Sequence, residues 1–421
     1  MADAAAPSGR CGIDSVEIAR IERLLAETPA GDLRRIFSVQ ELADAGDGPG
    51  RAASLAARFA AKEACAKLFL RETALGQLVP EDFSVTHDNY GAPQVVAAPN
   101  AAAAMGRHRI GRIALSLTHD RVSASAIALA ESTTLDAPLA GRLLFRFFPL
   151  RRDVILTNLI RVYGDAVAPD EIVRLAQAHY GHLWRLFGEF LKFRWLSHSR
   201  KAALVRVENI DALAAAAGQG KGVLVLTGHF GNWEVATIAG IGNYPEVRGR
   251  FHFVRRAIKP KWLDALVTRR FNRAGFGVLP KRGSLDAILE TLAAGDMIVF
   301  PFDQHARPPD GIEVDFFGHP AWTFKSLAII ALATGAPVLP ATSWREPDGR
   351  HVLRFETALA PIEHENTNEA IRLNTRAYNK TLERLILARP EQWYWVHRRW
   401  KTLRGKGAAS APRRDGSAGG F

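Results

Sequence analysis

Two residues in the middle of this chain have the types and spacing for acyl transfer. His229 and Glu234 lie five positions apart in the segment HFGNWE at 229–234. The apolar run at 222–228 predicts a buried strand, so the pair would lie in the turn that leaves it. A carboxylate on one ring nitrogen fixes the imidazole tautomer, and the other nitrogen can then take a proton from a hydroxyl. The spacing therefore predicts the transfer of an acyl group to an alcohol. Taken alone, it also fits a helix N-terminus that Asn232 caps and whose dipole Glu234 complements.

A second group of reactive residues lies near the start of the chain. Asp14 belongs to a short β-branched stretch, and Glu63 belongs to an alanine-rich helical pattern. Hard carboxylate ligands with open positions for phosphate oxygens suit Mg²⁺. Lys67 follows Glu63 by four residues, so both side chains would lie on one face of a helix. Taken alone, this spacing also fits a surface ion pair.

The pattern of apolar residues predicts two domains. In 10–131, strand-like stretches flank one long helix at 52–70, which favours an α+β domain. From 153 to about 399, helices alternate with short apolar strands, which favours an α/β domain with a mainly parallel central sheet. The strands predicted for this second domain are 222–226, 251–254, 297–300 and 338–341. We expect boundaries at 10–131, 132–150 and 151–401, followed by a disordered tail at 402–421.

Composition limits the class of protein. The 421 residues include only two cysteines, Cys11 and Cys65, which form no motif, so a reducing compartment is expected and a disulfide framework is not. We expect no signal peptide and no transmembrane segment. Up to Glu131 the chain carries 14 basic and 16 acidic residues, whereas the remainder carries 41 and 27. Since no nucleic-acid-binding signature is present, this basic excess predicts an acidic protein partner or an anionic lipid surface.

The first domain resembles the holo-acyl-carrier-protein synthase family. The resemblance rests on four segments in the family's order: GIDSVEIARI at 12–21, FAAKEACAK at 59–67, GAP at 91–93 and SLTH at 116–119. It implies Mg²⁺-dependent transfer of phosphopantetheine from coenzyme A to a serine of acyl carrier protein, by a homotrimer.

The same resemblance implies roles for individual residues of the first domain. Asp14 and Glu63 would hold Mg²⁺, Lys67 would handle the proton of the attacking serine, and Lys62 and His119 would bind substrate. The stretch LFLRET at 68–73 departs from the small residues that the family has there. A degenerate domain that only docks carrier protein is therefore the alternative.

The second domain resembles the bacterial lipid A lauroyl/myristoyl acyltransferase family. Besides HFGNWE, the resemblance rests on FPFDQH at 300–305, DFFG at 315–318 and PEQWYWVHRRWK at 390–401. It implies that His229 is the general base and Glu234 its partner. Asn232, Arg255 and Arg270 would bind substrate. The pair Asp303-Gln304 matches a loop of the family without a role we can assign, and His397, among tryptophans, is expected to be structural.

The two resemblances together predict a bifunctional enzyme that uses acyl carrier protein twice, with acyl-CoA as the alternative acyl donor. The acceptor of the acyl chain would be the hydroxyl of a lipid or of a specialised metabolite. A glycerol-phosphate acyltransferase shares the His-x4-acid spacing, but the tryptophan-rich segment argues against it. Members of the acyltransferase family begin with a membrane anchor, and here the first domain takes its place. We therefore expect a cytoplasmic protein held on the inner face of the membrane by the basic, aromatic segment at 141–152.

Overall fold

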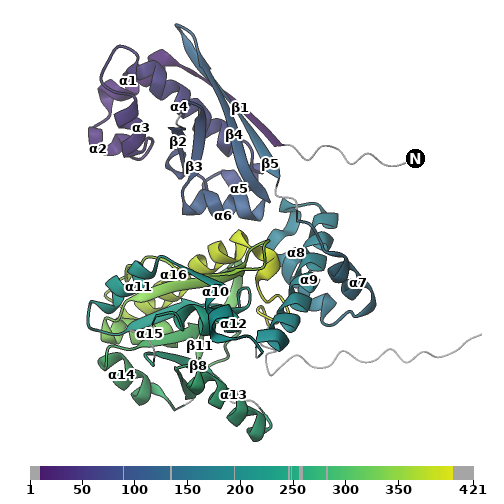
Figure 1. Ribbon diagram of the computed structural model, residues 1–421. Coiled ribbons are helices and arrows are strands. Elements are labelled where there is room, and N and C mark those ends of the chain that lie inside the picture. Colours follow the sequence, from purple (N-terminus) through teal and green to yellow (C-terminus); the bar gives the residue numbers. More distant parts are fainter. Residues whose placement is uncertain are drawn as a thin grey trace, which may run out of the picture.

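The protein forms two layered units that are joined by a short connection (Figure 1). The computed structural model describes residues 10–88, 90–132, 135–193, 195–244, 247, 249–255, 259–280 and 283–401. The first unit, in purple and blue, lies above the second, which runs from teal through green to yellow. The tail predicted at 402–421 lies outside the described residues.

The first unit is an antiparallel sheet with one long helix packed against it, which is the predicted α+β arrangement. The strand order is β1-β5-β4-β3-β2. Helix α4 (Arg51–Ala66) packs on β1 and β5 and buries a row of alanines in the core. The strands are β1 (Arg10–Glu17), β2 (Phe83–His87), β3 (Pro93–Ala97), β4 (Ile110–His119) and β5 (Ser123–Ser132). The shorter helices are α1 (Ile18–Glu27), α2 (Ala30–Leu33), α3 (Val39–Asp44), α5 (Arg71–Ala74) and α6 (Pro99–Arg107).

A glycine lets strand β1 approach helix α4 closely. A Cβ atom at Gly12 would lie 2.0 Å from the carbonyl oxygen of Ala64 and 3.2 Å from Cβ of Lys67. Only a residue without a side chain fits this contact. The close approach brings Asp14, two residues further along β1, to the C-terminal end of α4, where Lys67 lies.

The second unit contains a mixed sheet with the strand order β6-β14-β13-β7-β10-β8-β9. Strands β13 and β14 pair antiparallel, and the other neighbours pair parallel. The strands are β6 (Val205–Glu208), β7 (Val223–Thr227), β8 (Phe251–Arg255), β9 (Phe276–Pro280), β10 (Met297–Pro301), β13 (Val338–Arg345) and β14 (His351–Phe355). A separate hairpin is formed by β11 (Gly311–Phe316) and β12 (His319–Phe324).

Helices cover both faces of this sheet. In β7, Val223 and Val225 belong to one hydrophobic cluster, while Leu224 and Leu226 belong to another. Because both faces are buried, the strand has a continuous apolar sequence rather than an alternating one. The helices are α8 (Arg152–Tyr163), α9 (Pro169–Phe193), α10 (His198–Ala203), α11 (Ile210–Ala217), α12 (Trp233–Ile241), α13 (Lys261–Arg273), α14 (Leu285–Ala293), α15 (Ser326–Thr334) and α16 (Thr367–Ala388).

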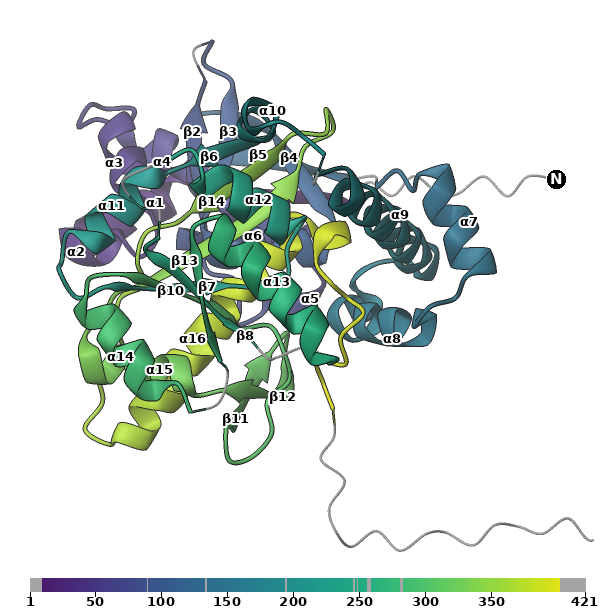
Figure 2. The same ribbon diagram turned by 60° about the horizontal axis from the view of Figure 1, so that its bottom comes forward.

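Helix α7 (Leu139–Phe147), from the predicted connecting segment, docks on α9 (Figure 2). A Cβ atom at Gly141 would lie 2.2 Å from the carbonyl oxygen of Gln177, so the two helices touch backbone to backbone. The ring of Phe145 packs edge-on against Tyr180, with 5.6 Å between the ring centroids. By contrast, Phe147 and Phe148 remain exposed.

The two units contact each other through α6 and α16. Gly106 of α6 faces Leu387 of α16 so closely that a Cβ atom would lie 2.7 Å from Cβ of Leu387. Arg10, at the start of β1, donates to the carbonyl oxygen of Ala166 at 2.9 Å. These contacts tie the strand that carries Asp14 to the second unit.

We predict that Gly106→Ala lowers the midpoint of thermal unfolding, because the new methyl group overpacks the contact with Leu387. Overpacking typically costs about 1–3 kcal/mol, more than the helix propensity of about 1 kcal/mol that alanine adds. The matched control is Gly188→Ala in α9, where nothing lies within 4 Å of the added Cβ, and its midpoint should rise. Equal increases for both variants, measured by calorimetry, would contradict the packing described here.

Candidate active sites

His229 follows β7, and its ring is held by Asp303, a carboxylate that follows the neighbouring strand β10. Nδ1 of His229 lies 2.9 Å from Oδ1 of Asp303, and the backbone N–H of His229 donates to Oδ2 at 2.7 Å. Strands β7 and β10 are parallel neighbours, and Thr227 pairs with Pro301, so their carboxyl ends meet at one edge of the sheet. Residues that follow the two strands are thereby brought together.

Asp303 is fully buried and accepts three hydrogen bonds. The third comes from Nε1 of Trp393, 2.9 Å from Oδ2. Burial alone would raise the pKa of Asp303, but the neighbouring His229 and these hydrogen bonds outweigh burial and hold the pKa well below its usual range. An ionised Asp303 keeps the proton on Nδ1 of His229, which leaves Nε2 with a lone pair for a hydroxyl proton.

The depressed pKa of Asp303 also affects the stability of the protein. Because the folded-state pKa of Asp303 is depressed, its contribution is present above the unfolded-state pKa and is lost as pH falls through the folded value. This carboxylate therefore resists protonation in mild acid, and its contribution to stability is lost only at strongly acidic pH.

The carboxylate on Nδ1 of His229 is Asp303, which corrects the role expected for Glu234. Glu234 lies in the first turn of α12, partly buried, where an acidic side chain complements the helix dipole. The spacing within HFGNWE indicated Glu234 as the partner of the His229 ring, whereas Asp303 is 74 residues away in sequence. The sequence feature that could have indicated Asp303 is its position, with Gln304, directly after an apolar strand.

Three rings surround the imidazole of His229. The ring centroid of Trp233 lies 4.9 Å away, that of His397 5.3 Å and that of Tyr394 6.2 Å. The sequence favours a structural role for His397, yet its ring lies beside that of His229, the candidate base. Burial, together with the charges of His229 and nearby basic residues, lowers the pKa of His397, so this ring is neutral at physiological pH.

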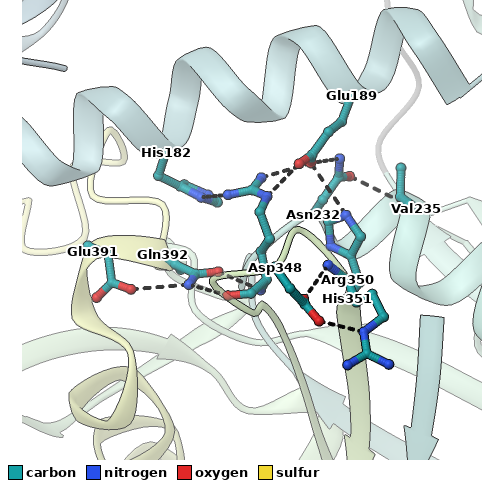
Figure 3. Close-up of polar contacts among 10 residues, drawn as sticks. His182, Glu189, Asn232, Val235, Asp348, Arg350, His351, Glu391 and Gln392 are labelled. Carbon is teal, nitrogen blue, oxygen red and sulfur yellow. Dashed lines mark hydrogen bonds and ion pairs between the residues drawn. The ribbon is translucent and has the colours of Figure 1, made fainter. Parts of the chain in front are cut away.

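Glu189 of α9 joins the His229 loop to the sheet (Figure 3). Its carboxylate accepts two hydrogen bonds from the guanidinium of Arg345, one of them 2.7 Å long, and one of 2.9 Å from Nδ2 of Asn232. Oδ1 of Asn232 accepts from the backbone N–H of Val235 at 3.2 Å and caps α12. One charged pair thus anchors the start of the helix that follows His229.

Gln392, in the segment that follows α16, also holds the His229 loop in place through backbone hydrogen bonds. Gln392 accepts from the backbone N–H of Arg345 at 2.7 Å and donates to its carbonyl oxygen at 3.0 Å. The carbonyl oxygen of Gln392 accepts from the N–H of Gly231 at 2.9 Å. Gly231 has a φ of 53°, and a Cβ atom there would lie 2.8 Å from the carbonyl oxygen of Ser343. Glycine is therefore required in this loop.

Of the residues expected to bind the acyl substrate, Asn232 has a different role. It is 3% exposed and both ends of its side chain are used within the protein, so it positions the loop. Arg255, at the end of β8, pairs with Asp264 at 2.7 Å and donates to Oγ1 of Thr268 at 2.6 Å, both on α13. Arg270 lies on the same helix, and its side chain lies outside the described part.

In the first unit, β1 and α4 bring two of the predicted residues into contact. Lys67 donates to Oδ1 of Asp14 at 2.7 Å and to the carbonyl oxygen of Ile13 at 2.9 Å. Glu63 lies on α4 one turn before Lys67 and is partly exposed. Among the described residues no group of three His, Cys, Asp or Glu side chains could hold a metal. Mg²⁺ commonly takes only one or two carboxylates and completes its shell with phosphate oxygens and water, so Asp14 and Glu63 stay a prediction for this ion.

Lys62 is a core residue rather than a substrate contact. It is 1% exposed and donates to Glu41 at 2.8 Å and to the carbonyl oxygen of Pro80 at 3.2 Å. Burial lowers the pKa of Lys62, and the charge of Glu41 opposes that shift. His119, by contrast, is exposed at the end of β4. It lines an open pocket of ≈ 980 Å³ together with Arg58, Ser54 and His87.

Comparison with known proteins assigns each unit to a family. Residues 136–402 match the model of the bacterial lipid A biosynthesis acyltransferases, and residues 10–120 match that of the 4'-phosphopantetheinyl transferase superfamily. A phosphatidylinositol mannoside acyltransferase of Mycolicibacterium smegmatis is 27% identical over 58% of this chain and 77% of its own length. A holo-[acyl-carrier-protein] synthase of Moorella thermoacetica is 40% identical over 29% of this chain and 93% of its own length.

Solved structures match the first unit. The crystal structure of Helicobacter pylori holo-[acyl-carrier-protein] synthase in complex with coenzyme A is 27% identical. It covers 29% of this chain and 99% of that chain, with a TM-score of 0.25.

We predict that Asp303→Asn lowers the rate of acyl transfer by about 10²–10⁴-fold, close to the loss for His229→Ala. An amide cannot hold the proton on Nδ1 or stabilise the imidazolium that forms. Glu234→Gln should lose much less, since Nδ1 already has its partner. The measurement is the initial rate with an acyl carrier protein donor at saturating concentration. An Asp303→Asn enzyme as active as wild type, beside an inactive Glu234→Gln enzyme, would return the role to Glu234.

Proposed function

Since the chain belongs to the bacterial lipid A biosynthesis acyltransferase family and carries a holo-[acyl-carrier-protein] synthase domain, we propose that both active sites serve one acyl carrier protein. Residues 10–131 would attach phosphopantetheine to the carrier, and residues 151–401 would move an acyl chain from the loaded carrier to a lipid hydroxyl. The observation that carries the proposal is the presence of both constellations, His229 with Asp303 and Asp14 with Lys67, on one chain. Tethering raises the effective concentration of the shared carrier at the second site.

In the proposed acyl transfer, His229 acts as base and then as acid. Nε2 takes the proton of the acceptor hydroxyl as the oxygen attacks the thioester carbonyl, and Asp303 stabilises the imidazolium. When the carbon–sulfur bond breaks, the imidazolium returns the proton to the thiolate of the phosphopantetheine arm. The buried site around Asp303 strengthens these interactions because little water screens them.

In the proposed phosphopantetheine transfer, the serine oxygen of the carrier attacks the phosphorus that bears the pantetheine arm of coenzyme A. The bridging P–O bond of the pyrophosphate breaks, and adenosine 3',5'-bisphosphate leaves. A Mg²⁺ ion on Asp14 and Glu63 would neutralise the phosphate charge. Lys67 is held at Asp14 by a 2.7 Å ion pair and lies where it can handle the proton of the serine. The open pocket beside His119 and Arg58 is the candidate site for the rest of the coenzyme.

The alternative, a first domain that only docks carrier protein, rests on the departure at 68–73. In the structure Leu68 and Phe69 are 2% and 6% exposed and belong to the core of the first unit. They therefore lie away from the pocket beside His119, whose lining does not include them. This placement favours an active domain over a degenerate one.

We extend the proposal to the homotrimer that the family resemblance implies. The outer face of the first sheet carries exposed apolar side chains in register, with Ile13 of β1 opposite Ile127 of β5, and Leu129 two residues further on. An apolar sheet face of this kind suits contact with further copies of the domain.

Attachment to the inner face of the membrane is also proposed, through α7 and α9. Among the described residues, no helix combines the length and apolarity needed to cross a bilayer. On α9, Trp184, Phe187 and Leu191 are exposed at spacings of three and four residues and so form one stripe, and Trp195 is exposed shortly after the helix ends. Phe147 and Phe148 of the α7 segment are exposed as well, and exposed apolar residues of this kind suit a peripheral membrane helix.

We predict that the full chain adds about 340 Da of phosphopantetheine to an apo carrier protein only when Mg²⁺ is present, by the chemistry implied for the metal site. Asp14→Ala or Glu63→Ala should end this reaction and leave acyl transfer unchanged, because the two sites lie in separate units. Mass spectrometry of the carrier is the readout. Apo carriers that stay unmodified by wild-type protein would establish the docking-module alternative.

We predict that the protein floats with anionic vesicles and that flotation weakens at high salt, since each basic residue near the surface contributes about 1 kcal/mol that screening reduces. Changing Phe147, Phe148 and Trp195 to serine should reduce flotation further, because their apolar insertion is lost. The matched control changes Val39, Leu75 and Val122, exposed apolar residues of the first unit, to serine. An equal loss in both variants would contradict the surface named here.

A further inference from the structure

A groove lined by basic side chains lies beside the segment that carries His397. Its volume is ≈ 530 Å³, and it is formed by one face of α8 and the residues after His397. Arg161, Arg398 and Lys401 line it, with Asp153 as the one acidic residue of the lining. Neither reaction described above uses these residues.

The segment on one side of the groove is rigidly held. The guanidinium of Arg399 is fully buried and donates to the carbonyl oxygen of Trp322 at 2.8 Å and to Oγ1 of Thr323 at 2.6 Å. Because Arg399 points inward, its neighbour Arg398 is exposed toward solvent, as is Lys401. The backbone that carries Arg398 is therefore held in place by Arg399.

The cations of the groove have no anionic partner among the described residues: none of Arg161, Arg398 and Lys401 forms an ion pair with a carboxylate there. Arg161 instead stacks over the ring of Trp400, 5.6 Å from its centroid. Three cations in one groove with a single carboxylate favour a bound anion, and guanidinium groups suit phosphate oxygens in particular.

The groove is also close to the candidate base. Asn158, which lines the groove, donates to the carbonyl oxygen of His397 at 2.8 Å, and the ring of His397 lies 5.3 Å from that of His229. We propose that this groove binds the phosphodiester of a substrate during acyl transfer, an inference that rests on the proposed function. That phosphodiester is present both in the phosphopantetheine arm of an acyl carrier protein and in the headgroup of a phospholipid acceptor.

The test measures binding by calorimetry on the full chain carrying His229→Ala, so that no turnover occurs. One probe is dodecanoyl carrier protein, and the other is glycerophosphoinositol, a headgroup phosphodiester without acyl chains. Changing Arg161, Arg398 and Lys401 to glutamine should raise the Kd of at least one of the two probes by about tenfold, because charge-assisted hydrogen bonds are lost. Asp153→Asn should lower the same Kd, since it removes the one negative charge of the lining.

The matched control changes Arg350, Arg354 and Arg372, surface arginines paired with carboxylates, to glutamine, which removes the same charge elsewhere. If the triple glutamine variant of the groove binds only the carrier more weakly, or only glycerophosphoinositol more weakly, the result supports phosphodiester binding in the groove. It also identifies which substrate supplies the phosphodiester. Unchanged Kd values for both probes, an equal effect in the control, or weaker binding by Asp153→Asn would overturn it. Turnover of wild-type protein is measured separately, so normal probe binding without acyl transfer would count against the proposed function alone.

Discussion

The contact between His229 and Asp303 is the interaction on which the second active site depends. A buried carboxylate is unfavourable unless donors surround it, and Asp303 receives hydrogen bonds from the ring and backbone of His229 and from Trp393. Those donors come from the end of β7 and from the segment after α16, while Asp303 itself follows β10. The site therefore forms only when the parallel pairing of β7 with β10 and the docking of the C-terminal segment are both in place.

A charge pair between the buried Arg345 and the partly buried Glu189 maintains that arrangement. Glu189 and Arg345 connect α9 to β13, and through Asn232 they set the start of α12. Because Arg345 is buried, removing Glu189 would leave its charge uncompensated, so both charges are needed together. Gln392 adds two neutral hydrogen bonds to the backbone of Arg345. Gly231 has no side chain and so allows the His229 loop to approach the backbone of Ser343 closely. These hydrogen bonds thus explain how a short loop can hold the side chain of His229, the candidate base, in one orientation.

Much of the architecture could be predicted from local sequence patterns, because buried strands are continuous apolar runs. The predicted strands at 222–226, 251–254, 297–300 and 338–341 correspond to β7, β8, β10 and β13. Shorter or more polar strands such as β6 and β14 were missed, since they carry no such run.

Partners that are distant in sequence were harder to predict. Asp303 meets His229 only through the order of strands in the sheet, and a single sequence does not reveal that order. The prediction that Lys62 binds substrate was wrong for a related reason. Lys62 lies on a buried face of α4, where it pairs with Glu41. Lys67, five residues further along, instead reaches Asp14 at the surface. Charged residues in a motif can thus serve either the core or the site, and only packing separates the two.

The central claim is that one carrier protein links the two active sites. It is tested most directly by supplying the full chain with apo carrier protein, Mg²⁺, a phospholipid acceptor and coenzyme A whose thiol carries a labelled dodecanoyl group. The first site would place the labelled acyl-phosphopantetheine arm on the carrier, and the second would pass the dodecanoyl group to the lipid. We predict label in the lipid only when apo carrier is present, and none with either Asp14→Ala or His229→Ala. Labelled lipid formed without carrier, or formed equally well by Asp14→Ala, would contradict the account.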